Sequence, residues 1–183
     1  VDTASILFDG VNYIGPANTP NYSLIINSVN GTTWLSNKLS EQPVGLSDIG
    51  YFDGKYIITS TNTATPIFVS TDGVSWATTG LVSGTVSIDS TQLYSVSYLN
   101  GKYIAVGNNI VSSTDAYNWR EVYSFYGSTM YSISGITITN FNGFIAVGYG
   151  PDYSVIPTIT QSVVLNSLDG ITWTNVTPSG SAE

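Results

Sequence analysis

The side chains that could carry acid–base or charge-pairing chemistry are few in this chain of 183 residues. It has twelve acidic residues, four basic residues, and neither histidine nor cysteine. Histidine general bases, cysteine nucleophiles, Cys/His zinc sites and disulfides are therefore excluded. The basic residues are three lysines and Arg120, and the formal net charge is -8. A partner that is held through its phosphates, such as nucleic acid, is not expected.

The carboxylates do not form a recognisable catalytic motif. Glycoside hydrolysis needs two carboxyl groups that flank one bond, and a dedicated Ca²⁺ loop needs closely spaced oxygen ligands. Once acids in turns, in strands and at the termini are set aside, Glu41, Asp48, Asp89 and Asp152 remain, in different parts of the chain. We therefore expect a protein that is not an enzyme, with no catalytic residue, no metal site and no cofactor.

A heptapeptide that ends in tryptophan occurs four times and accounts for every tryptophan of the chain. Its copies occupy 28–34, 70–76, 113–119 and 167–173, which separates successive tryptophans by 42, 43 and 54 residues. The Asp or Asn at the third position can accept hydrogen bonds from backbone N–H groups of its own turn, and the Trp can anchor the next strand by burying its ring. We expect structural roles for these residues: Asn30, Trp34, Asp72, Trp76, Asp115, Trp119, Asp169 and Trp173.

A second repeated element precedes each heptapeptide. In it, an apolar run meets Asp-Gly or Asn-Gly, at Asp9, Asp53, Asn100 or Asn142, and a further apolar run follows. This pattern predicts a tight hairpin, because a type I′ turn needs positive φ at both central residues. Each repeat thus contains a hairpin of two strands, followed by two strands that the heptapeptide joins.

The third repeat shows the expected strand positions most clearly. We predict strands near 94–99, 102–107, 110–113 and 119–123, and no helix. The apolar runs do not alternate cleanly with polar residues. That is expected of strands that are buried on both faces of their sheet, as they are between packed blades.

The heptapeptides resemble the Asp-box (BNR) repeats of the β-propeller superfamily that includes the sialidases. The copies at 70–76 and 167–173 match the short pattern Ser-x-Asp-Gly-x-x-Trp in full, whereas Asn30 replaces Asp in the first copy and Ala116 replaces Gly in the third. The resemblance implies an all-β propeller of four four-stranded antiparallel blades, as a four-bladed ring or as part of a larger propeller. One domain would span 1–183, with repeats at about 4–40, 46–82, 92–125 and 134–178.

The resemblance to sialidases does not extend to their catalytic residues. Sialidases hold the carboxylate of the substrate with three arginines and use a Tyr nucleophile paired with a Glu. A clamp of three guanidinium groups cannot be built from Arg120 alone. We therefore expect a sialidase-like propeller without sialidase activity, in which the Asp-boxes lie on a rim away from the ligand site.

The lengths of the loops indicate where a ligand would bind. The hairpins and heptapeptides are short and repeated, and the alternation of strand direction places both on one face, so the variable loops share the other face. These loops are rich in Tyr, Asn, Ser and Gly, which suit contacts with sugars or protein surfaces. The candidate ligand-binding residues are Tyr22, Asn108, Tyr126, Tyr149, Asp152 and Tyr153.

Two functions remain open from the sequence. The first is a non-catalytic surface module, structural or adhesive, of the virion, phage-tail or secreted-adhesin type. The second is a lectin-like carbohydrate-binding propeller. The expected partners are protein neighbours in an assembly or surface glycans, without nucleic acid or membrane insertion, and the expected location is extracellular or on a virion surface. Tyrosines around a concave pocket would favour sugar binding, and a flat apolar face would favour assembly.

Overall fold

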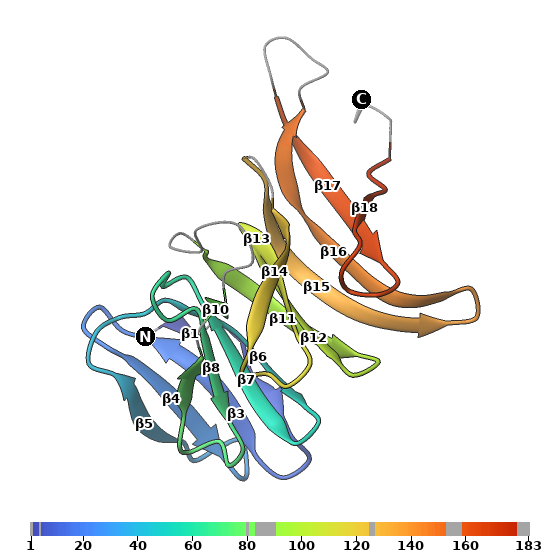
Figure 1. Cartoon of the computed structure of the whole chain (residues 1–183). Helices are drawn as coiled ribbons and strands as arrows, with labels where there is room; N and C mark the ends of the chain where they lie inside the picture. Colours follow the sequence, from blue (N-terminus) through green and yellow to red (C-terminus); the bar gives the residue numbers. More distant parts are fainter. Residues whose placement is uncertain are drawn as a thin grey trace.

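The computed structural model describes residues 2–3, 5–79, 81–82, 91–124, 127–152 and 159–178, and these residues form only strands and loops. The strands make four sheets that follow one another along the chain (Figure 1). The prediction of an all-β propeller with four four-stranded antiparallel blades is confirmed. A search of the described residues finds no helix long and apolar enough to cross a membrane.

The first two blades have the strand order of the sequence. The first contains β1 (Asp2–Thr3), β2 (Leu7–Phe8), β3 (Tyr13–Asn18), β4 (Ser23–Ser28) and β5 (Leu35–Ser40). Because β1 and β2 both pair with β3, these two short strands share the place of a single first strand. The second contains β6 (Leu46–Phe52), β7 (Lys55–Ser60), β8 (Ile67–Ser70) and β9 (Ala77–Thr79).

The third blade follows the predicted strands to within one residue. It contains β11 (Leu93–Leu99), β12 (Lys102–Gly107), β13 (Asn109–Ser113) and β14 (Trp119–Ser124), and β10 (Leu81–Val82) adds a parallel fifth strand beside β14. The fourth blade contains β15 (Thr129–Ile138), β16 (Phe141–Asp152), β17 (Ile159–Ser167) and β18 (Thr174–Asn175).

The predicted hairpin turns are present in the second and third blades. Asp53 and Gly54 have φ of 50° and 71°, and Asn100 and Gly101 have φ of 52° and 77°. Positive φ at two successive residues is the geometry that a type I′ turn requires. In the first blade Asp9 starts a longer loop instead, since Phe8 pairs with Tyr13. Oδ1 of Asp9 accepts the backbone N–H groups of residues 11 and 12 in this loop.

The predicted turn at Asn142–Gly143 in the fourth blade is wrong. Both residues lie inside β16, where they pair with Thr137 and Ile136 of β15. The ladder continues to the pair of Ile138 with Phe141, so the chain reverses at 139–140. The longer ladder satisfies additional backbone groups, and this tertiary gain outweighs the local preference of Asn-Gly for a turn.

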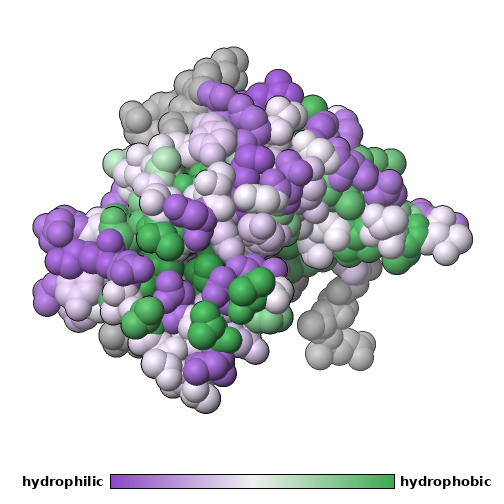
Figure 2. Space-filling view, turned by 90° about the horizontal axis from the view of Figure 1, so that it is seen from below, coloured by the Kyte–Doolittle hydropathy of each residue, from purple (hydrophilic) through white to green (hydrophobic). Residues whose placement is uncertain are grey.

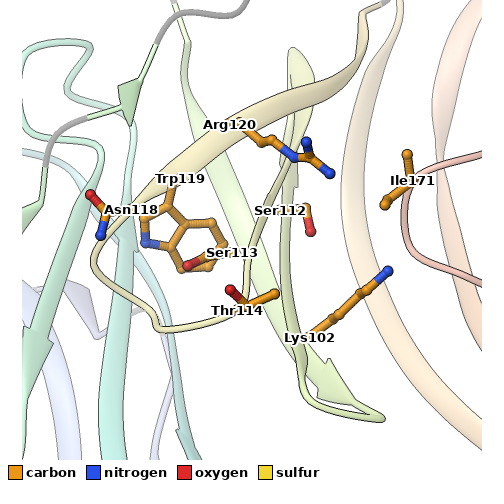
Figure 3. A pocket seen from close by; sticks show the side chains of 8 residues that line it. All are labelled: Lys102, Ser112, Ser113, Thr114, Asn118, Trp119, Arg120 and Ile171. Atoms are coloured by element: carbon orange, nitrogen blue, oxygen red, sulfur yellow. The ribbon is translucent and has the colours of Figure 1, made fainter.

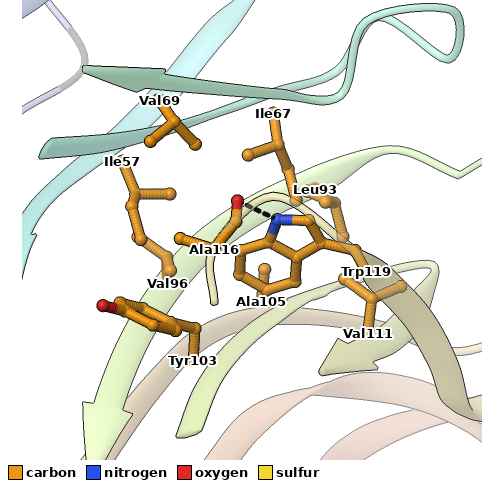
Figure 4. Close-up of a cluster of buried hydrophobic side chains, with 10 residues drawn as sticks. All are labelled: Ile57, Ile67, Val69, Leu93, Val96, Tyr103, Ala105, Val111, Ala116 and Trp119. Atoms are coloured by element: carbon orange, nitrogen blue, oxygen red, sulfur yellow. Dashed lines mark hydrogen bonds between the residues drawn. The ribbon is translucent and has the colours of Figure 1, made fainter. Parts of the chain in front are cut away.

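Each pair of neighbouring blades encloses one hydrophobic cluster. Trp119 lies in the cluster between the second and third blades, beside Ile67 of β8 and Val111 of β13 (Figure 4). Ile104 of β12 instead joins Phe144 in the cluster between the third and fourth blades. Tyr103 and Ala105, the strand neighbours of Ile104, lie in the former cluster. Adjacent residues of one strand therefore face different neighbouring blades, which explains why the apolar runs do not alternate with polar residues.

The four blades form an open arc within the described part of the chain. Close contacts join the first blade to the second, the second to the third and the third to the fourth, while the first and fourth sheets lie at opposite ends of the molecule (Figure 1). The outer faces of these two blades are therefore exposed, as Trp34 and Val147 show with 40% and 43% of their surface accessible. Seen from below, apolar and polar side chains are interspersed (Figure 2).

Candidate functional site

A β-bulge occurs at the same position in three blades. The ladder shifts by one residue between Leu46 and Asp48, between Leu93 and Ser95, and between Met130 and Ser132. The extra residues are Ser47, Tyr94 and Tyr131. A bulge re-aims the side chain of its extra residue and often lies beside a functional site. In the third and fourth blades this device presents a tyrosine.

Tyr94, Tyr131 and Tyr149 form a row of aromatic rings, here called the tyrosine row. The ring centroids of Tyr94 and Tyr131 are 5.1 Å apart, and those of Tyr131 and Tyr149 are 5.5 Å apart. Tyr131 and Tyr149 have 46% and 42% of their surface exposed. The row thus crosses from β11 of the third blade to β15 and β16 of the fourth and is open to a ligand.

Hydrogen bonds hold the row and its surroundings in place. The hydroxyl of Tyr94 donates to Oε1 of Gln92 at 3.1 Å, and the backbone carbonyl of Gln92 accepts the N–H of Asn108 at 3.1 Å. Oδ1 of Asn108 in turn accepts the hydroxyl of Thr129 at 3.3 Å, and Thr129 pairs with Tyr149 in the ladder. One connected network therefore joins Asn108 to both ends of the row.

The hydrogen bond with Tyr149 raises the pKa of Tyr131 to about 12, and desolvation contributes in the same direction. Tyr131 is therefore a neutral phenol at physiological pH, because its pKa lies far above 7. A neutral phenol can donate one hydrogen bond and accept others. The row offers ring faces for apolar contact and hydroxyl groups for polar contact.

The structure brings together only part of the predicted ligand site. Asn108 and Tyr149 lie at the same end of the third and fourth blades. Tyr22 lies between β3 and β4, where the ammonium group of Lys38 is 5.0 Å from its ring centroid. It belongs to the first blade, so the second blade separates it from the blades that contain Asn108 and Tyr149. Tyr126, Tyr153 and the side chain of Asp152 lie outside the described residues.

Tyr94 and Tyr131 were not among the candidates predicted from the sequence. They occupy corresponding positions of two repeats, each directly after the first buried apolar residue of its strand. Alignment of the repeats could have revealed that correspondence. The bulge that makes the side chains available depends on pairing with β12 and β16, and no local sequence signal reports it.

The four heptapeptides form turns with the same hydrogen bonds. The Ser hydroxyl donates to Oδ1 of the Asp or Asn, at 3.1, 2.9, 3.0 and 3.0 Å along the chain. The same Oδ1 accepts two backbone N–H groups of its turn, those of Val74 and Ser75 in the case of Asp72. Ala116 adopts the positive φ, 71°, that glycine adopts in the other three turns. The departures at Asn30 and Ala116 therefore leave the turn geometry intact.

The turns differ in the burial of their tryptophans. Trp119 is fully buried and Trp173 nearly so, Trp76 is half-buried, and Trp34 is 40% exposed. The expectation that every ring is buried is therefore wrong for Trp34. Trp76, Trp119 and Trp173 each pack in the cluster shared with the preceding blade, whereas Trp34 belongs to the first blade of the arc.

No protein-family model matches this chain, and no curated protein matches it. Solved structures share its fold. A protein of Bifidobacterium bifidum assigned as an exo-β-1,3-galactanase is 13% identical, with a TM-score of 0.57 over 94% of this chain and 68% of that one. An exo-β-1,3-galactanase of Clostridium thermocellum is 14% identical, with a TM-score of 0.51 over 93% and 47%. YCF48 with a bound peptide is 13% identical, with a TM-score of 0.50 over 94% and 66%.

These likenesses define a class of fold. The chain is a β-propeller, as these structures are, and it spans about two thirds or less of the length of these three structures. The expectation that the chain is not an enzyme is overturned by this finding, because one of the three is an exo-β-1,3-galactanase and another is assigned as one. The lack of three arginines excluded only the sialidase site for the substrate carboxylate. Glycoside hydrolysis in general requires two suitably placed carboxyl groups, which need not share a motif.

Proposed function

We propose that this chain is a propeller that recognises carbohydrate and that the tyrosine row is its contact surface. The observation that carries the proposal is the exposure of two neighbouring rings, those of Tyr131 and Tyr149. The bulge in β15 presents Tyr131 beside Tyr149 on the open face of the fourth blade. Tyrosine supplies a large rigid ring with a polar end at low entropic cost, which suits a ligand with apolar C–H faces and hydroxyl groups.

We further propose that the repeats are Asp-boxes of the BNR type. The support is the shared hydrogen-bond pattern of the four turns, in which one oxygen of Asp or Asn serves two backbone N–H groups and the Ser hydroxyl. A contact between a turn and a hairpin supports their expected place on one face: Lys102 follows the hairpin turn of the third blade, and its ammonium group donates to the carbonyl of Asp169 at 2.6 Å. Their role in this proposal is structural.

Galactan with β-1,3 linkages is the first polysaccharide to test, because one structure with this fold is an exo-β-1,3-galactanase and another is assigned as one. Recognition of surface glycans is also consistent with an extracellular or virion-surface location, which we propose for the protein. Release of reducing sugar from the same polysaccharide would show whether recognition is accompanied by hydrolysis.

The test is a glycan array followed by calorimetric titration of the best ligand. We expect Tyr131→Ala and Tyr149→Ala each to weaken binding by at least about tenfold, which corresponds to about 1.4 kcal/mol. Tyr51→Ala is the matched control, since Tyr51 is an exposed tyrosine of the second blade, outside the row. Wild-type affinity in both row variants, or the absence of any glycan ligand, would contradict the proposal.

A further inference from the structure

A groove between the third and fourth blades contains two of the four basic residues of the chain. Its volume is about 410 Å³, within the range of small-molecule sites. Lys102, Ser112 and Arg120 come from the third blade, and Ile171 comes from the heptapeptide turn of the fourth. The side chains of Arg120 and Lys102 extend toward Ile171 across the groove (Figure 3).

The charge of this groove contrasts with that of the protein. The chain has a formal net charge of -8. Within its described part, the ion pairs involve Lys38 and Lys55, and Arg120 takes part in no ion pair and no side-chain hydrogen bond. Lys102 donates to the backbone carbonyl of Asp169. The planar fork of donors that a guanidinium group offers to a carboxylate is therefore open.

The carboxylates next to the groove are engaged in their own turns. Oδ1 of Asp115 accepts the backbone N–H groups of Tyr117 and Asn118, and its Oδ2 accepts the side-chain amide of Asn118. Oδ1 of Asp169 likewise accepts the N–H groups of its turn. Neither carboxylate pairs with Arg120, so the positive charge of the groove is not neutralised by a salt bridge.

The groove is repeated by the fold, but its chemistry is not. In the first blade a groove of about 390 Å³ is lined by Asn12, Asn27 and Leu35. Asn27 pairs with Leu35 there as Ser112 pairs with Arg120 in the third blade. In the second blade the corresponding lysine, Lys55, is paired with Asp53. Among the described residues, the groove of the third and fourth blades therefore holds two basic groups that form no ion pair.

We propose that this groove binds a carboxylate-bearing sugar unit, such as a uronic acid residue of an acidic oligosaccharide. Arg120 binds the carboxylate with two N–H groups, and Lys102 adds a second positive charge. The hydroxyl of Ser112 is available to the hydroxyl groups of the sugar, and Ile171 contacts its C–H face. This inference rests on the proposed carbohydrate recognition and places a second, acid-specific subsite away from the tyrosine row.

The test is calorimetric titration of the full chain with trigalacturonic acid, with galactotriose as the neutral counterpart. We expect binding of the acidic sugar at least about tenfold tighter than that of the neutral one, and a loss of affinity as salt rises. Arg120→Gln should reduce the affinity for the acidic sugar at least about tenfold, and Arg120→Lys should restore it only in part, because lysine keeps the charge but lacks the fork.

Lys55→Gln is the control for charge, since it removes one positive charge in another blade, at the position that corresponds to Lys102, and should leave the affinity unchanged. Thermal unfolding of each variant identifies a change due to misfolding. Equal affinity of Arg120→Gln and Lys55→Gln would overturn the inference, as would inorganic phosphate competing as well as the acidic sugar. Loss of binding in Tyr149→Ala but not in Arg120→Gln would contradict the proposed role of the groove and would support binding at the tyrosine row.

Discussion

The first and third heptapeptide turns have the same local structure and different surroundings. Trp34 and Trp119 each donate their indole N–H to the carbonyl three residues earlier, at 3.2 and 2.7 Å, and lie 6.4 and 6.3 Å from the tyrosine ring of their own blade. Trp34 is nevertheless 40% exposed, and Trp119 is fully buried.

The difference comes from the preceding blade. Ile57, Ile67 and Val69 of the second blade pack in the cluster that contains Trp119, whereas Trp34 belongs to the first blade of the arc, which has no preceding blade. A turn motif therefore determines where the tryptophan is placed, and the neighbouring blade determines how much the ring stabilises the fold. Four predictions test this comparison.

The largest effect is expected for Trp119→Ala. Removal of a fully buried large aromatic ring leaves a cavity and typically costs about 3–5 kcal/mol. We therefore expect the free energy of unfolding to fall by about that amount, measured by urea denaturation followed by circular dichroism. A loss below about 1 kcal/mol would show that the neighbouring blade contributes little to the stability of this turn.

The next largest effect is expected for Gly73→Ala. Gly73 has φ of 71°, and a Cβ at this position would lie 2.8 Å from Cδ1 of Ile14 on the preceding blade. Gly31→Ala has the same backbone cost without that contact, since its nearest neighbour would be 3.7 Å away. We expect a loss of about 2–3 kcal/mol for Gly73→Ala and about 1 kcal/mol for Gly31→Ala. Equal losses of unfolding free energy for the two variants in urea denaturation would show that the contact with the preceding blade does not contribute to the cost.

A small effect is expected for Trp34→Ala. Its ring lacks the preceding blade and loses mainly the contact with Tyr13, so we expect a loss of about 1 kcal/mol or less. The measurement is the same denaturation as for Trp119→Ala, which makes the difference between the two variants directly comparable. A loss as large as that of Trp119→Ala would indicate that Trp34 is buried in solution, for example by association.

The smallest effect is expected for Asp72→Asn and depends on pH. The backbone N–H groups of Ser75 and Val74 and the Ser70 hydroxyl lower the pKa of Asp72 from 3.8 to about 2. A carboxylate whose pKa is lower in the folded state stabilises the fold above pH 4, and this contribution is lost as pH falls from about 4 to about 2.

Asn30 holds the corresponding place in the first turn with an amide that does not titrate in this range. Asp72→Asn should therefore flatten the decrease of the urea midpoint between pH 4 and pH 2, and Asn30→Asp should steepen it. Unchanged slopes in both variants would show that these side chains do not link turn stability to pH.

The strands and turns of the repeats could be predicted from the sequence because their signals are local. The Asp-Gly and Asn-Gly turns at 53–54 and 100–101 and the strands of the third repeat agree with the structure. The turn predicted at Asn142 fails because pairing with Thr137 extends the ladder. Asn108 and Tyr149 were predicted as ligand contacts, but Tyr94 and Tyr131 were not, because a bulge forms only when two strands pair.

The sequence by itself determined the four blades and their heptapeptide turns, since each heptapeptide forms its hydrogen bonds within seven residues of chain. Only the tertiary structure decided which tryptophan is buried and which basic groups share a groove. Lys102 meets Asp169 across 67 residues of sequence, and Trp119 meets Ile57 of the preceding blade. Such contacts depend on the packing of whole sheets, in which each strand face is buried or exposed according to the blade that lies against it.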